Sequence, residues 1–586
     1  MKAVFSYLKA GAWAAVAVCF ALVFAQVWLD LKLPDYMAEI TTRVQTPGSE
    51  MRDVWVAGAK MLVCCLASVA TSIAVGYISA RVAAGFSRDL RGGLFAHVEN
   101  FTMEEISGFS TASLITRTTN DITQVQMLVA MGLQIVIRAP IMAVWAMLKI
   151  SAKQWEWTAL VGASIGAMVL LIVFMMIYAL PKFRKIQTLT DNLNRVTREN
   201  LTGIRVVRAY NADKYEEEKF GTANHELTDN NLKVFSAMAV FMPFITIVIN
   251  GMSLGIYWIG AYLIDAAPRT DKITLFADMI TFSQYSMQVL MSFMMLVMIF
   301  VMLPRVMVSV RRIAEVLTTE PRIRDGSITE SPAGIAGEIV FANVSFKYPG
   351  AEDYVLRDVS FSAKRGETVA IIGSTGSGKS SLLNLVPRFY DTTEGSVRID
   401  GIDVREYTQE ALRNKLGYVP QRALLFKGTV AENVKFGSTG RTRSNAESEI
   451  KQAVSIAQGT DFVEAMADAY DASISQGGTN VSGGQKQRLS IARAIYRNPE
   501  ILLFDDTFSA LDYKTDRALR SALKRETAGV TSLIVAQRIG TIRDADKILV
   551  LDEGHLAGSG THSELMQSCE VYRQIAYSQL SEEELA

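Results

Sequence analysis

The stretch that decides the fold is GSTGSGKS, residues 373–380, which fits the pattern G-x-x-x-x-G-K-[ST]. The residues before it, GETVAIIG, have the character of a buried strand, and KSSLLNLV after it resumes as a helix. In this context the backbone N–H groups of the loop can surround phosphates at a helix N-terminus, whose dipole favours anions. The stretch therefore predicts a phosphate-binding loop between a strand and a helix.

Individual residues of this loop have distinct expected roles toward ATP and Mg²⁺. Lys379 should reach the β- and γ-phosphates, and Ser380 should ligate Mg²⁺. The remaining residues expected to contact the nucleotide are Gly373, Ser374, Thr375, Gly376, Ser377, Gly378 and Ser381.

Two further motifs follow in the same half of the chain. The apolar run ILLFDD at 501–506 ends in acids, which places Asp505 to bind Mg²⁺ through water. Between the two lies VSGGQKQR at 481–488, where a glycine pair opens a helix. The three motifs together predict an α/β P-loop nucleotide-binding domain over 337–582, preceded by a linker at 321–336.

The first half of the chain is far more apolar than this domain. The chain has 586 residues, half of them hydrophobic, so more than one domain is expected. A bilayer core needs about 20 apolar residues in a helix. Six runs are long enough: about 10–32, 54–80, 125–148, 157–180, 235–264 and 274–303. The first run is too long for the core of a signal peptide, and five more follow. We expect an all-α six-helix transmembrane domain over 1–320.

Basic residues indicate the orientation of this domain. The loops near 81–124 and 181–234 carry most of the Lys and Arg, and the other three connections hold about two each. The positive-inside rule therefore predicts that both long loops, both termini and the nucleotide-binding domain lie in the cytosol. The formal net charge is zero, which gives no electrostatic footprint for nucleic acid.

Polar and flexible side chains within the spans suggest a cavity. Asp30, Lys60, Arg138 and Asp278 lie in or near them, and charges at such depth usually face a cavity or a partner helix. For Arg138, a role in packing or snorkelling is an equal alternative. The sixth span carries Met287, Met291, Met294, Met295, Met298 and Met302. Such thioethers suit a surface that adapts to varied apolar ligands, or they are simple packing residues.

Over nearly its whole length the chain resembles an ABC transporter half of the exporter type. The resemblance implies that Tyr348 in FKYPG stacks on adenine and that Gln421 in GYVPQ touches Mg²⁺ and faces the membrane domain. Two further motifs match the family. The signature motif, expected to close over ATP bound to the other subunit, is Ser482, Gly483, Gly484 and Gln485, and the D-loop is Ser509, Ala510, Leu511 and Asp512.

The resemblance also implies how the two domains communicate. SLITRTTND and ENLTGIRVVRAY are similar to the family's intracellular loops, and segments near 103–113 and 209–220 are the expected coupling helices. The family's functional unit has two membrane domains and two ATPase domains, with two ATPs between them. A second half-transporter is therefore the expected partner, in a bacterial inner or cytoplasmic membrane.

Two positions depart from the family's pattern. Asp506 replaces the glutamate that activates the attacking water, and Gln537 in TSLIVAQR replaces the histidine that contacts the γ-phosphate. Aspartate is one methylene shorter, and glutamine cannot carry a positive charge. Either change alone could be a tolerated conservative replacement. Together they predict a degenerate site in a heterodimeric exporter whose partner carries the competent Walker motifs. A homodimer with two slow sites is the alternative.

The expected activity is ATP-driven export of amphiphilic small molecules or drugs. An importer, a peptide or lipid transporter, or an ATP-gated sensor or channel of the same shape are the alternatives. A non-transporting ABC ATPase carries no membrane spans, so the first 305 residues exclude it.

Overall fold

The computed structural model describes residues 2–46, 48–151, 153–330, 336–437 and 446–580. The chain divides into two compact units: Met1–Glu99 with Ala112–Thr319, and Asn100–Thr111 with Glu320–Ala586. The domain boundaries expected from sequence, 1–320 and 337–582, stay predictions. Residues 331–335 of the expected linker, and 438–445 and 581–582 of the expected second domain, lie outside the described residues.

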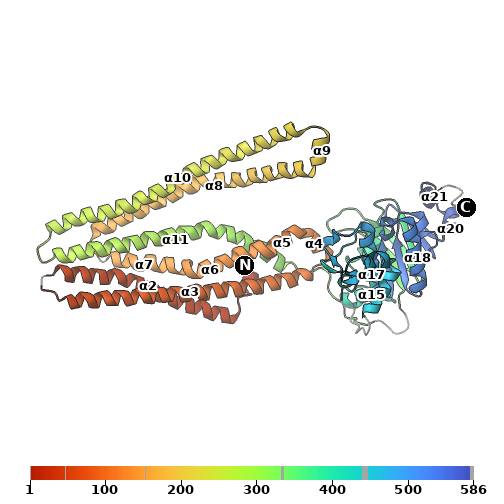
Figure 1. Cartoon of the computed structure of the whole chain (residues 1–586), viewed down its shortest axis with the longest axis horizontal. Helices are drawn as coiled ribbons and strands as arrows, with labels where there is room; N and C mark the ends of the chain where they lie inside the picture. The colour runs from red at the N-terminus through yellow and green to blue at the C-terminus, as the bar shows by residue number, and fades with distance from the viewer. Residues whose placement is uncertain (1, 47, 152, 331–335, 438–445, 581–586) are drawn as a thin grey trace. The chain divides into compact units, whose positions relative to one another are not determined.

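The first unit is built of long apolar helices (Figure 1). They are α2 (Ala10–Gln45), α3 (Met51–Glu99), α8 (Trp155–Thr202), α10 (Asp213–Ala266), α11 (Lys272–Thr318) and a composite third crossing, Thr111–Ser151. Short helices α1 (Lys2–Phe5) and α9 (Ile204–Ala209) accompany them. Within the described residues, six helices are long and apolar enough to cross a membrane. Each contains one of the expected spans, so the six-helix prediction is confirmed.

The third crossing is irregular. It consists of α5 (Thr111–Thr116), α6 (Ile122–Met131) and α7 (Ile137–Ser151), joined by π-helical turns at Arg117–Asp121 and Gly132–Val136. Such turns widen the helix locally.

The membrane-length helices extend far beyond a bilayer. At 49 residues, α3 is roughly 74 Å long, whereas the hydrocarbon core is about 30 Å thick. The helices α8 and α10 lie side by side and are joined through α9 (Figure 1). The short connecting helix α9 overlaps the expected segment 209–220 only at Ala209, because Asp213 already begins α10.

The second unit contains two main sheets. The mixed sheet has the order β12-β11-β3-β10-β9-β6, with only β12 antiparallel. Its strands are β3 (Thr368–Gly373), β6 (Leu416–Val419), β9 (Ile501–Asp505), β10 (Thr531–Val535), β11 (Lys547–Asp552) and β12 (His555–Gly560). An antiparallel sheet has the order β2-β1-β4-β5, from β1 (Ile339–Phe346), β2 (Leu356–Ala363), β4 (Glu394–Ile399) and β5 (Ile402–Asp403). A small pair joins β7 (Gly428–Thr429) and β8 (Ser473–Ile474).

Helices surround these sheets. They are α4 (Met103–Phe109), α12 (Lys379–Leu385), α13 (Gln409–Asn414), α14 (Val430–Val434), α15 (Ala446–Ile456), α16 (Thr460–Glu464), α17 (Gly483–Tyr496), α18 (Tyr513–Glu526), α19 (Ile539–Ile542), α20 (His562–Ser568) and α21 (Glu570–Tyr577). The parallel strands β3, β10 and β9 are neighbours, so their carboxyl ends meet at one edge. Ligands of open α/β sheets bind at this edge.

The expected coupling segment near 103–113 forms α4, which belongs to the second unit. Thr102 caps this helix together with Glu105. The Glu105 carboxylate also accepts a hydrogen bond from the backbone N–H of Arg322 at 3.1 Å, and the Arg322 guanidinium contacts Glu104 at 2.9 Å. These contacts tie α4 to the start of the chain's second half.

Candidate functional site

The phosphate loop connects β3 to α12 and depends on glycine. Gly376 and Gly378 have φ of 89° and 96°, a left-handed conformation that glycine adopts without steric cost. A Cβ on Gly373 would lie 2.0 Å from the carbonyl oxygen of Leu551. The loop thus forms a cradle of backbone that larger residues would fill.

Lys379 begins α12 at the end of this loop and is 9% exposed. Its Nζ donates to the carbonyl oxygens of Gly373 at 2.9 Å and Ser374 at 2.6 Å. Burial lowers the pKa of this ammonium, because a charged amine loses hydration there. An anionic phosphate in the cradle would replace that lost solvation.

The expected Mg²⁺ ligands lie together. Ser380 Oγ, in the first turn of α12, donates to Asp505 Oδ1 at the end of β9 over 2.7 Å. Burial raises the pKa of the Asp505 carboxyl, and the neighbouring Asp506 charge acts in the same direction. Hydroxyl and carboxylate oxygens are the ligands that Mg²⁺ prefers, and a cation would offset this burial. These residues therefore fit a magnesium nucleotide.

The two residues that depart from the family's pattern contact each other. Gln537 Nε2 donates to Asp506 Oδ2 at 2.8 Å, and Gln421 Nε2 donates to the same oxygen at 3.3 Å. Asp506 has φ 43° and ψ 35°, and its carbonyl oxygen accepts from Ser509 Oγ at 2.8 Å. Burial raises the pKa of the Asp506 carboxyl. Two glutamines from separate motifs thus donate to one carboxylate oxygen of Asp506, which belongs to a third motif.

The residue expected to stack on adenine lies at the other end of the loop. The Tyr348 hydroxyl is 2.8 Å from Ser381 Oγ. Its ring meets Tyr390 edge-on, with ring centroids 5.3 Å apart, and the Tyr390 hydroxyl is hydrogen-bonded to Ser107 in α4. Sequence reasoning missed Tyr390, because no motif contains it. Its position links the nucleotide end of the domain to the expected coupling helix.

The signature residues begin α17. Ser482 caps this helix, donating its backbone N–H to Gln485 Oε1 at 2.9 Å and accepting the Gln485 N–H at 3.3 Å. Ser482 and Gly483 are exposed. In the described part of the chain, no hydrogen bond joins residues 482–485 to the phosphate loop.

Together, a six-span helical unit and an α/β unit with a phosphate loop define a membrane-embedded ATPase. The chain belongs to the ABC transporter family. Residues 10–303 match the model of the ABC transporter transmembrane region, and residues 356–509 match the ABC transporter model. It is therefore a transport-coupled ATPase of the bacterial cell membrane that works beside a second ABC subunit, with its ATP-binding domain in the cytosol.

The alignments with curated relatives cover most or all of this chain. An uncharacterized ABC transporter ATP-binding protein of Mycobacterium tuberculosis is 38% identical over 96% of both chains. Another, of Bacillus subtilis, is 35% identical over 100% of this chain and 99% of its own. An ATP-dependent lipid A-core flippase of Pseudomonas fluorescens is 32% identical over 84% of this chain and 80% of its own.

A solved structure shares the fold. A bacterial Atm1-family ABC exporter with ATP bound superposes with a TM-score of 0.77 at 24% identity, covering 98% of this chain and 100% of that one.

Proposed function

We propose that this chain is the degenerate-site subunit of a heterodimeric ABC exporter that moves amphiphilic small molecules. The observation that carries the proposal is the environment of Asp506. Its carboxylate stands where the family's catalytic glutamate does, and one of its oxygens already accepts hydrogen bonds from the amides of Gln421 and Gln537.

This arrangement is poorly suited to activate water. A general base must reach the water's proton within about 2.6–3.2 Å, and Asp506 is one methylene short of the usual residue. The amides of Gln421 and Gln537 occupy Oδ2 of Asp506, and the Gln421 hydrogen bond partly opposes the rise in the carboxyl pKa that burial causes. Gln537 donates a hydrogen bond but cannot take up a proton as histidine does. The site is suited to hold ATP rather than to hydrolyse it quickly.

The rest of the nucleotide machinery supports tight binding. The phosphate loop, the Ser380–Asp505 pair and Tyr348 retain the groups that the family uses for ATP and Mg²⁺. The signature residues are intact at an exposed helix N-terminus. We therefore assign them to the competent site, whose Walker motifs belong to the partner.

The sixth span bears on the cargo. Met291 and Met298 of α11 are 48% and 52% exposed, which supports an adaptable apolar surface. Lipid translocation is a second candidate, favoured by relatives named as lipid A-core flippases. ATP-dependent uptake into inverted vesicles is measured for a fluorescent amphiphile and for a fluorescent lipid. The substrate that is taken up distinguishes export of small molecules from lipid translocation.

A single-turnover experiment tests the asymmetry. The subunits are loaded with ATP labelled in the γ-phosphate, and photocrosslinking reports which Walker site retains the label. We expect label to persist at this chain's Walker motifs and to disappear from the partner's, and Asp506→Glu should speed the loss here. Equal loss from both sites in the wild-type complex would contradict the proposal.

A further inference from the structure

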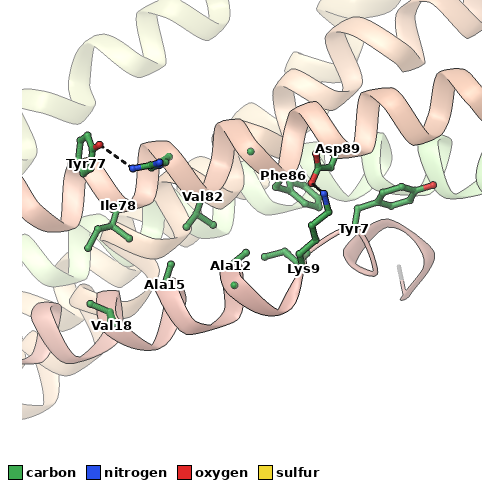
Figure 2. Close-up of a pocket in the computed structure, with 14 residues that line it drawn as sticks. Tyr7, Lys9, Ala12, Ala15, Val18, Tyr77, Ile78, Val82, Phe86 and Asp89 are labelled. Atoms are coloured by element: carbon green, nitrogen blue, oxygen red, sulfur yellow. Dashed lines mark hydrogen bonds and ion pairs between the residues drawn. The ribbon is translucent and has the colours of Figure 1, made fainter.

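A groove lies near the N-terminus of the membrane unit, between the start of α2 and the middle of α3. It has a volume of about 540 Å³, and all its lining residues come from positions 7–18 and 77–89. Figure 2 shows Ala12, Ala15 and Val18 of α2 facing Ile78 and Val82 of α3. Small side chains on α2 leave the space open, and the lining is mostly apolar.

Cations lie along this groove at the cytosolic boundary of the membrane. Lys9 immediately precedes the first expected span, and Arg81 immediately follows the second. The two spans run in opposite directions, so these positions fall at the same end. By the positive-inside rule this end faces the cytosol, at the level of lipid headgroups.

The charge of the groove is positive. Lys9 Nζ contacts Asp89 at 2.7 Å (Figure 2). The Arg88 guanidinium, outside the groove lining, contacts the same carboxylate at 2.8 Å, so that acid is already neutralised. Arg81 is exposed and donates to the Tyr77 hydroxyl at 3.3 Å. Among the described residues, no carboxylate lies within ion-pair distance of Arg81.

We infer that this groove binds an anionic phospholipid of the cytosolic leaflet. The phosphate would lie beside Arg81, and an acyl chain would follow the apolar floor toward Val18. Lys9 is held at Asp89, eight residues and roughly 12 Å along α3 from Arg81, so it would face the polar end of the headgroup and not the same phosphate. Anionic headgroups gain about 1 kcal/mol per nearby Lys or Arg.

The test is native mass spectrometry of the purified full chain with added phosphatidylglycerol or phosphatidylcholine of identical acyl chains. We expect preferential retention of phosphatidylglycerol. Arg81→Gln keeps a donor for Tyr77 but removes the charge, and should lower phosphatidylglycerol affinity about fivefold while leaving phosphatidylcholine unchanged. Lys185→Gln, an exposed cytosolic-side cation on α8, should leave both unchanged.

A steric variant tests the floor of the groove independently. A Cβ on Gly85 or on Gly76 meets no atom within 4 Å, so both positions accept a side chain. Gly85 lines the groove, whereas Gly76, nine residues away, lies on the opposite face of α3. Gly85→Leu should weaken retention of both lipids, and Gly76→Leu should not.

Three results would overturn the inference. They are equal retention of the two lipids by the wild-type chain, unchanged phosphatidylglycerol retention in both Arg81→Gln and Gly85→Leu, and competition by glycerol phosphate as strong as that of the intact lipid. Retention of lipid needs no ATP hydrolysis, so its failure is distinguishable from failure of the proposed export function.

Discussion

At the residue scale, Asp505 at the end of β9 and Asp506 directly after it are two adjacent, buried carboxylates. Burial raises the pKa of both above the ordinary value of 3.8. Between pH 3.8 and the raised pKa, these carboxyls therefore hold more protons in the folded state than in the unfolded state. Stability of the nucleotide-free domain falls over this window and stays reduced at neutral pH. A bound cation relieves this cost.

Asp505→Asn should therefore have opposite effects with and without ligand. Without nucleotide at neutral pH, we expect the unfolding temperature to rise by ~2–4 °C, the shift that about 1 kcal/mol gives in a domain of this size. The extra stabilisation by ATP with Mg²⁺ over ATP alone should be lost. Thermal unfolding followed by fluorescence measures both effects.

The matched control is Asp353→Asn, which removes an exposed carboxylate from a loop. Asp353→Asn should change neither the unfolding temperature without nucleotide nor the extra stabilisation by Mg²⁺. A lower unfolding temperature for nucleotide-free Asp505→Asn, or an intact Mg²⁺ effect, would show that burial does not dominate at this carboxylate.

At the element scale, the sequence predicted six spans because about 20 consecutive apolar residues have no other common explanation. It predicted the strand–loop–helix around Lys379 because motif and context agree. It could not predict that Tyr390 packs against Tyr348, or which helix partners Arg138. Those contacts join residues far apart in the chain, and local pattern carries no information about them.

The structure gives Arg138 a partner. Its Nη2 lies 2.8 Å from Asp30 Oδ2, joining α7 to α2, with side chains 32% and 15% exposed. Ser68 of α3 donates to the other Asp30 oxygen. Of the two alternatives open from sequence, this geometry favours a role in packing the spans.

Breaking this pair should destabilise the membrane unit. Asp30→Asn leaves the Arg138 charge uncompensated within the spans, at a cost of about 2.5–3.5 kcal/mol. We expect a lower unfolding temperature in detergent, partly restored by adding Arg138→Gln, whereas Lys60→Gln, at an exposed position, should have little effect. If Arg138→Gln abolished transport with unchanged stability, Arg138 would instead contact cargo.

At the scale of the whole molecule, we propose that one chain supplies half of each of two composite ATP sites. The sequence motifs predicted which residues belong to the site. Only the structure showed that the amides of Gln421 and Gln537 both donate hydrogen bonds to one carboxylate oxygen of Asp506. It also placed the signature residues at an exposed helix start. Completion by a second subunit follows from the family, and we propose that this subunit is a different chain.

Mutations in the two motifs of this chain should therefore have unequal effects on the complex. A Cβ on Gly483 meets no atom within 4 Å, so Gly483→Asp should fold normally. We expect it to remove at least 90% of steady-state ATP hydrolysis by the heterodimer, because it disrupts closure over the partner's nucleotide. Asp506→Asn should change the rate less than twofold. The reverse ranking, measured by phosphate release, would place the competent site on this chain.

The most direct measurement is the ATPase rate of this chain purified alone and with candidate partner half-transporters. We expect the chain alone to be nearly inactive, and a partner carrying glutamate and histidine at the positions of Asp506 and Gln537 to restore turnover. Asp506→Glu with Gln537→His should then give the chain alone measurable activity. Brisk hydrolysis by a dimer of the unmodified chain would show that Asp506 suffices as the base, and would contradict the asymmetric mechanism.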